Sequence, residues 1–142
     1  MSRIYVMRHG SCDTAVEPMS LSSEGQEIIK KASALLPRDL SLQEVHTSCK
    51  LRCVQTARIV AAKTGYTRSL LVREELVTHL SSTWLRQLSC YSEYSACLIV
   101  THLPAIQEFL REQSLLGAAN MRLHPGCIFC FDFARKTAQK IY

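Results

Sequence analysis

The stretch Val6-Met7-Arg8-His9-Gly10 joins an apolar N-terminal segment to an arginine, a histidine and a glycine. Residues 2–7 are mostly apolar at alternate and intervening positions, which predicts a strand buried on both faces. Open α/β sheets bind ligands just outside the carboxyl ends of their strands, where this tripeptide lies. Arg8 offers a fork of donors for a phosphoryl or carboxylate group, and His9 can act as nucleophile or base. Gly10 lets the backbone turn and a ligand approach closely.

Strand and helix patterns alternate along the rest of the chain. Strands are predicted at residues 40–47, 69–72, 96–100, 127–133 and 137–142, and helices at 22–36, 52–63, 81–90 and from Pro104, with 11–20 as a loop. Ser22 or Ser23 can cap the first helix, and Pro37 stops it. The pattern predicts an α/β fold in one domain over residues 1–142, an α/β/α sandwich with a mostly parallel sheet.

Composition and charge exclude several partners. There are 17 Lys and Arg against 12 Asp and Glu, giving a net charge of +5. No basic run with interleaved aromatic residues stands out, so we expect no nucleic-acid partner. The N-terminus lacks the pattern of a signal peptide, and no apolar stretch is long enough for a membrane span. We therefore expect a cytoplasmic protein with no membrane partner.

Seven cysteines in a chain without an export signal predict reduced thiols. Cys127 and Cys130 are three residues apart on a predicted strand and so point to opposite faces, which disfavours a shared metal. Cys49 and Cys53 have His46 nearby but no second correctly spaced pair. We expect no metal site and no cofactor.

Two further candidates lie at predicted strand ends. His102 follows the strand at residues 96–100, and Arg52 begins a helix just past the strand at 40–47, where the helix N-terminus favours an anion. A doubly wound sheet brings such ends together in one crevice. Phosphoryl transfer needs in-line positioning and positive charge around the phosphoryl oxygens. Arg8, His9, Arg52 and His102 would supply both.

Three motifs together resemble the histidine phosphatase superfamily, the phosphoglycerate mutase-like group. The motifs are Arg8-His9-Gly10, Ser48-x-x-x-Arg52-x-x-Gln55-Thr56-Ala57 and Val100-Thr101-His102. The resemblance implies the phosphoglycerate mutase-like fold. It also implies that His9 attacks phosphorus and becomes a phosphohistidine, while Arg8, Arg52 and His102 hold the phosphoryl oxygens.

Within that superfamily, the chain resembles the small phosphohistidine phosphatases of the SixA type. The resemblance lies in the short chain and in two motifs, Leu21-Ser22-Ser23-Glu24-Gly25 and His102-Leu103-Pro104. Cys49 and Cys53 replace the proline and alanine that relatives often carry, but Arg52 remains in place. Two helices and a strand fill the chain between Arg52 and His102, so we expect no lid insertion. An open site suits a phosphate presented on a protein surface.

Several residues with polar side chains lie close in sequence to the two histidines and to Arg52. Ser11 and Thr101 follow and precede the two histidines, so each is a candidate to bind the phosphate through its hydroxyl. Gln55 and Thr56 are interpreted as helix packing and capping residues.

The general acid is the open part of the site. Many superfamily members place a glutamate after the third strand; Glu75 matches that position best, and Glu74 is the alternative. Glu75 is equally well interpreted as a surface carboxylate paired with Arg73. A phosphohistidine has a nitrogen leaving group that can be protonated before cleavage, so such a substrate does not require a strong protein acid.

Three functions are compatible with these residues. The favoured one is a phosphatase, a protein histidine phosphatase acting on signalling or phosphotransfer proteins. The second is a small-molecule phosphomonoesterase of broad specificity, and the third is a non-catalytic phosphate-binding module. The expected partner is a phosphorylated protein or a small phosphorylated substrate, and the expected oligomeric state is a monomer or weak dimer. Arginines and a histidine nucleophile replace a cation, so the activity is expected to be metal-independent.

Overall fold

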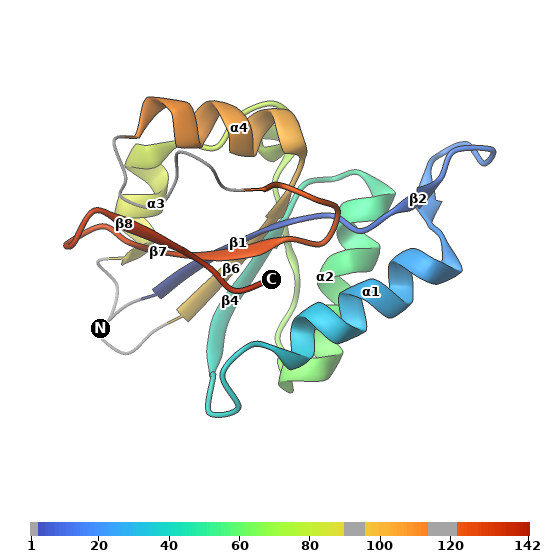
Figure 1. Ribbon diagram of the computed structural model, residues 1–142, viewed down its shortest axis with the longest axis horizontal. Helices are drawn as coiled ribbons and strands as arrows, with labels where there is room; N and C mark the ends of the chain where they lie inside the picture. The colour runs from blue at the N-terminus through green and yellow to red at the C-terminus, as the bar shows by residue number, and fades with distance from the viewer. Residues whose placement is uncertain (1–2, 90–95, 114–121) are drawn as a thin grey trace.

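A six-stranded sheet forms the centre of the molecule (Figure 1). The structure is a computed structural model, and it describes residues 3–89, 96–113 and 122–142. The strands of the sheet are β1 (Arg3–Arg8), β4 (Leu42–Thr47), β5 (Leu71–Val72), β6 (Ala96–Thr101), β7 (Ile128–Asp132) and β8 (Thr137–Lys140), in the order β5-β4-β6-β1-β7-β8. From β5 to β1 the neighbours pair in parallel. The pairs β1–β7 and β7–β8 are antiparallel. The predicted mostly parallel α/β sheet is confirmed.

Helices cover both faces of the sheet. One face packs against α1 (Ser23–Ala34) and α2 (Leu51–Thr64), and the other against α3 (Ser82–Ser89) and α4 (Leu103–Glu112). A 3₁₀ helix, η1 (Glu74–Val77), precedes α3. None of the helices within the described ranges has the length and apolar character of a membrane span.

Side chains of β1 contribute to the hydrophobic cores on both faces of the sheet, because successive residues of a strand point to opposite faces. Ile4 and Val6 pack with residues of α3 and α4, such as Leu85 and Phe109. Tyr5 and Met7 belong to the other core, which includes residues of α1 and α2. Burial of β1 on both faces holds this strand at the centre of the sheet and therefore sets the place where His9 leaves it.

Local signals in the sequence explain most helix ends. The Ser22 hydroxyl caps α1 by accepting a hydrogen bond from the Gly25 N–H at 2.9 Å. Gly65 ends α2 in the left-handed conformation, with φ of 74°. Helix α1 ends at Ala34, two residues before the predicted Leu36, because the chain tightens into i→i−3 turns there.

Several segments differ from the prediction. The predicted loop at 11–20 contains two short strands, β2 (Cys12–Asp13) and β3 (Ser20–Leu21), which pair in a separate two-stranded sheet. Residues 74–77 form a turn of 3₁₀ helix that no periodicity indicated. Strand β1 extends to Arg8, because that residue still pairs with Thr101 on β6. Residue 90, the predicted end of the third helix, lies outside the described residues.

Candidate active site

The pairing of β1 with β6 places the two histidines side by side. Arg8 is the register partner of Thr101, so the next residue on each strand, His9 and His102, leaves the sheet at the same point. The His9 N–H donates to the Thr101 carbonyl at 3.2 Å. The two imidazole rings lie 5.4 Å apart between centroids, at an interplanar angle of 63°. The predicted meeting of these strand ends is therefore present in the structure.

Strand β4, on the other side of β6, brings in Ser48 and Arg52. The Ser48 N–H donates to the Val100 carbonyl at 3.1 Å, which continues the strand pairing past Thr47. Helix α2 starts three residues later, and its first turn carries Arg52. The Ser48 hydroxyl lies 2.8 Å from Nε2 of His102, and Nη2 of Arg52 lies 3.4 Å from Nδ1 of the same ring.

These two contacts assign the tautomer of His102. A guanidinium only donates hydrogen bonds, so Nδ1 of His102 accepts from Arg52. The ring proton then resides on Nε2 and is donated to the Ser48 oxygen. The sequence motif contains Ser48 but does not indicate its role; in the structure Ser48 orients His102.

The Arg8 guanidinium is anchored through one of its nitrogens. Nη1 donates to the Leu123 carbonyl at 2.8 Å, which anchors the side chain against the segment before β7. Nε is buried and has no hydrogen-bond partner among the described residues. A buried N–H without an acceptor is costly, and a phosphoryl oxygen is an acceptor that would satisfy it.

The Gly10 backbone holds His9 in one tautomer. Nδ1 of His9 lies 2.8 Å from the Gly10 carbonyl oxygen; because a carbonyl only accepts, Nδ1 carries the proton and Nε2 has the free lone pair. The Gly10 N–H donates to the Thr56 hydroxyl at 3.2 Å, and that hydroxyl donates to the Arg52 carbonyl at 2.8 Å. Thr56, interpreted from sequence as a packing residue, thus connects the His9 loop to α2.

Both histidines are electrostatically biased toward the neutral form. Burial has the largest effect on the pKa of His9 and lowers it. The Gly10 hydrogen bond offsets part of this by raising the pKa, and the charges of Arg52 and Arg8 make smaller contributions that lower it. Burial, followed by Arg52, His9 and Lys50, lowers the pKa of His102 to about 4. The site at neutral pH therefore combines a neutral imidazole carrying a free lone pair with two arginine cations.

Two thiols lie beside the histidines. Sγ of Cys12 is 3.7 Å from Nδ1 of His9, and Sγ of Cys53 is 3.5 Å from Nε2 of His102. Burial raises the pKa of both thiols, that of Cys53 to about 11, so they are protonated at neutral pH. All six cysteines within the described ranges are free thiols. No group of three or more metal-ligating side chains occurs among the residues that the structure describes.

Ser11 and Thr101 both make contacts that hold the site's loops in place, Ser11 through its carbonyl and Thr101 through its hydroxyl. The carbonyl of Ser11 accepts hydrogen bonds from the backbone N–H and the hydroxyl of Ser22, which fastens the loop after Gly10 to the start of α1. Thr101 is fully buried, and its hydroxyl donates to the Leu76 carbonyl. That bond directs the Thr101 proton away from a phosphate and attaches η1 to β6.

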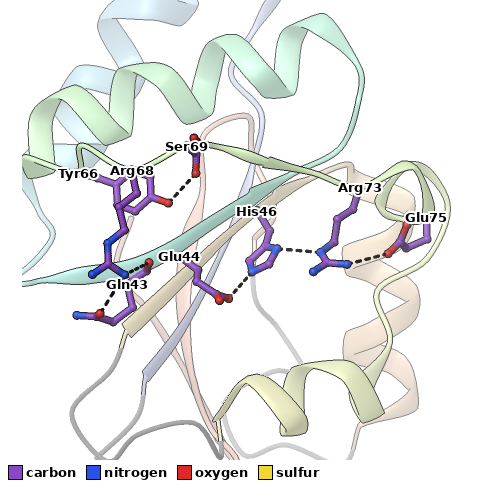
Figure 2. A network of polar contacts seen from close by, with 8 residues as sticks. All are labelled: Gln43, Glu44, His46, Tyr66, Arg68, Ser69, Arg73 and Glu75. Carbon is purple, nitrogen blue, oxygen red and sulfur yellow. Dashed lines mark hydrogen bonds and ion pairs between the residues drawn. The ribbon is translucent and has the colours of Figure 1, made fainter.

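Glu75 belongs to a separate polar network (Figure 2). Its carboxylate, on a side chain that is 63% exposed, lies 3.6 Å from Nη1 of Arg73. Nε of Arg73 donates to Nδ1 of buried His46 at 2.9 Å, and His46 contacts Glu44 through Nε2 at 2.8 Å. Among the described residues, no contact joins the Glu75 carboxylate to the two histidines. The surface pairing with Arg73, weighed as an alternative from sequence, is the arrangement observed.

Two histidines and two arginines lie at the carboxyl edge of a mostly parallel sheet, the place where open α/β proteins bind their ligands. The sequence pattern of the histidine phosphatase superfamily (branch 1) matches residues 4–77, just over half of the chain. The chain belongs to this superfamily. The matched region carries Arg8, His9 and Arg52, while His102 is brought in by the fold.

Solved structures of the superfamily share the fold. The protein histidine phosphatase SixA complexed with tungstate superposes with a TM-score of 0.81 at 19% identity, covering 99% of this chain and 94% of that one. A putative phosphohistidine phosphatase SixA from Agrobacterium tumefaciens gives 0.75 at 18%, covering 99% and 95%. A putative alpha-ribazole-5'-P phosphatase from Escherichia coli K-12 gives 0.73 at 18%, also covering 99% and 95%. No curated protein sequence matches the chain.

Proposed function

We propose that the protein is a phosphatase in which Nε2 of His9 is the nucleophile. The observation that carries this proposal is the 2.8 Å contact between Nδ1 of His9 and the Gly10 carbonyl, which leaves the Nε2 lone pair unused. The depressed pKa of His9 keeps that lone pair unprotonated at neutral pH. Arg8 and Arg52 add the positive charge that a phosphoryl group in transfer requires.

The reaction proceeds in two displacements. Nε2 of His9 attacks phosphorus, a P–Nε2 bond forms, and the bond to the leaving group breaks as that group takes up a proton. Water then attacks the phosphohistidine, transfers a proton to solvent and releases inorganic phosphate and free His9. The lowered pKa of His102 keeps it neutral at neutral pH; a phosphoryl dianion beside it favours its protonated form, which supplies another donor.

The substrate that fits best is phosphohistidine on a signalling or phosphotransfer protein. Its leaving group is an imidazole nitrogen, which can be protonated before cleavage and so needs no strong protein acid. The pairing of Glu75 with Arg73 is compatible with such a substrate. The likeness to SixA structures favours the same substrate class, and we place the activity in the cytoplasm with no requirement for a metal.

Dephosphorylation of a phosphohistidine-bearing protein domain tests this proposal. The domain and a generic aryl phosphate are each incubated with wild type and with His9→Ala, in the presence of a chelator. Rapid loss of phosphohistidine that disappears in His9→Ala is the expected result. Failure of both substrates to react would leave the phosphate-binding module as the better interpretation. Loss of activity in chelator would contradict metal independence.

A small-molecule phosphomonoesterase is the second candidate. The likeness to the alpha-ribazole-5'-P phosphatase structure, at a TM-score of 0.73, favours it because the fold accommodates that type of enzyme as well. In the same assay it predicts rapid cleavage of small phosphomonoesters and none of the phosphoprotein.

A further inference from the structure

The segment at residues 122–126 packs directly against Arg8 and His9. Nη1 of Arg8 donates to the Leu123 carbonyl at 2.8 Å, and the Gly126 N–H donates to the His9 carbonyl at 3.1 Å. Side chains of this segment therefore border the phosphoryl site. Arg122 is exposed and His124 is partly buried, so the segment presents both toward the molecular surface.

Positive charge accumulates around His124. Nζ of Lys140, from β8, lies 3.4 Å from Nδ1 of His124, and the His124 ring makes an edge-to-face contact with Tyr142, with centroids 5.0 Å apart. After burial, the groups that lower the pKa of His124 are Lys140, Arg122 and Arg8, which are all cations. His124 is thus a neutral ring surrounded by positive charges.

A further cation lies on the opposite side of the site. Lys50 is exposed at the N-cap of α2, and its charge acts on His102 together with that of Arg52. We refer to Lys50, Arg122 and Lys140 as the basic rim. None of the ion pairs found in the described part of the chain involves a residue of the rim.

The rim carries more charge than one phosphoryl group requires. Arg8 and Arg52 already match the two negative charges of a phosphoryl dianion in the site. Among the described residues, these three additional exposed cations have no carboxylate partner, so an anionic surface docking on them would neutralise their charge. Complementary charge of this kind increases association rates and selects partners more than it adds affinity.

We propose that the basic rim docks the acidic surface of a phosphoprotein around its phosphorylated residue. This inference rests on the proposed function and names the kind of protein the site accepts. The phosphorylated side chain enters between the two histidines, and acidic residues beside it contact Lys50 on one flank and Arg122 and Lys140 on the other. A small phosphomonoester reaches the phosphoryl site without touching the rim.

Charge reversal of the rim tests the proposal. The double variant Arg122→Glu/Lys140→Glu and the neutral variant Arg122→Gln/Lys140→Gln are compared with wild type. The control is Lys31→Glu/Lys63→Glu, which makes the same change in net charge in the last turns of α1 and α2. The probes are a phosphohistidine domain with acidic residues around the phosphohistidine, the same domain with those residues neutralised, and an aryl phosphate.

The expected result is graded and specific for the acidic domain. At low salt, kcat/KM for the acidic domain falls about 10-fold or more in the Glu variant and by less in the Gln variant. In both variants, kcat/KM for this domain declines less steeply with added salt than it does in wild type. In the control variant, kcat/KM for the acidic domain changes by less than about 2-fold, since surface charges remote from the contact act weakly. In the rim variants, kcat/KM for the neutralised domain and for the aryl phosphate also changes by less than about 2-fold.

Three outcomes would overturn the proposal. Unchanged kcat/KM for the acidic domain in both rim variants would remove the docking role and leave the phosphatase function intact. An equal loss with the aryl phosphate would mean that the rim acts through the phosphoryl site. Wild-type cleavage of the aryl phosphate with no reaction of either domain would refute the phosphoprotein function and the rim together.

Discussion

Nδ1 of His9 lies 2.8 Å from the carbonyl oxygen of Gly10, and this contact determines which nitrogen of the ring is free to attack. The proposed nucleophile is oriented by the backbone of its own neighbour, Gly10, and not by a carboxylate. Its environment is cationic, with Arg8 and Arg52 both lowering its pKa. Orientation and electrostatics therefore act together to keep the lone pair of Nε2 available.

The activity should have an acid limb set by His9. Because its pKa lies below the usual 6.5 and only the neutral ring attacks, kcat/KM should fall as pH drops, with a midpoint below 6.5. Removing a neighbouring cation relieves part of the depression, so Arg52→Met should move the midpoint upward in addition to lowering the rate. The measurement is a pH profile of aryl phosphate hydrolysis.

The control for that profile is Arg58→Met, at an exposed position on the same helix. Ionisation of the substrate is common to all variants, so only a change in the enzyme moves the midpoint between them. A midpoint that stays in place or moves downward in Arg52→Met would show that His9 does not control the acid limb.

Ser48→Ala should lower activity by releasing His102. The substitution removes the acceptor 2.8 Å from Nε2 of a ring that is only 5% exposed. One buried hydrogen bond is worth about 1 kcal/mol, so a loss of roughly 5- to 10-fold in kcat/KM is expected. The matched control is Ser33→Ala, which removes a buried hydroxyl bond to the Ile29 carbonyl within α1. Equal activities of the two variants would argue against a positioning role for Ser48.

Glu75→Gln decides whether this carboxylate is the general acid. The side chain pairs with Arg73 at 3.6 Å and is largely exposed. We expect hydrolysis of phosphohistidine to change by less than about 2-fold, because a surface ion pair of this kind contributes little. Glu74→Gln, measured in parallel, tests the adjacent alternative. A large fall in kcat with the aryl phosphate in one variant would identify that residue as the acid for oxygen leaving groups.

Gly25→Ala should destabilise the fold by steric conflict at the active-site loop. A Cβ at this position would lie 2.1 Å from the Ser11 carbonyl oxygen, a backbone atom that cannot move independently. We expect a loss of about 2 to 3 kcal/mol in unfolding free energy. Gly65→Ala is the comparison, since a Cβ there meets nothing within 4 Å and only the positive φ opposes it; about 1 kcal/mol is expected. Denaturant titration that ranks the two in reverse would contradict this account.

The sequence was sufficient to predict the strand ends and so the centre of the site. The apolar runs of β1 and β6 are unambiguous, and strands of a parallel sheet end on one edge, so His9 and His102 could be placed together. Thr101 shows where this reasoning stops. Its hydroxyl is directed to the Leu76 carbonyl, a group that reaches β6 only through the tertiary packing of η1.

Side-chain partners could not be predicted for similar reasons. The role of Ser48 depends on the register between β4 and β6, and that of Thr56 on the close approach of Gly10 to α2. The β2–β3 hairpin has two residues in each strand, which are too few to show the alternation of apolar and polar residues that indicates a strand. The formation of short strands and of hydrogen bonds between elements depends on tertiary packing, which the local sequence pattern does not reveal.

The most direct test of the histidine mechanism is isolation of the phosphorylated enzyme. Wild type is mixed with a radiolabelled phosphohistidine domain and with a labelled aryl phosphate, quenched with base within milliseconds to seconds, and digested for mass spectrometry. The account predicts a base-stable, acid-labile phosphoryl group on His9 from both substrates, absent in His9→Ala. Turnover by wild type with no label on His9, or label on another residue that persists in His9→Ala, would contradict it.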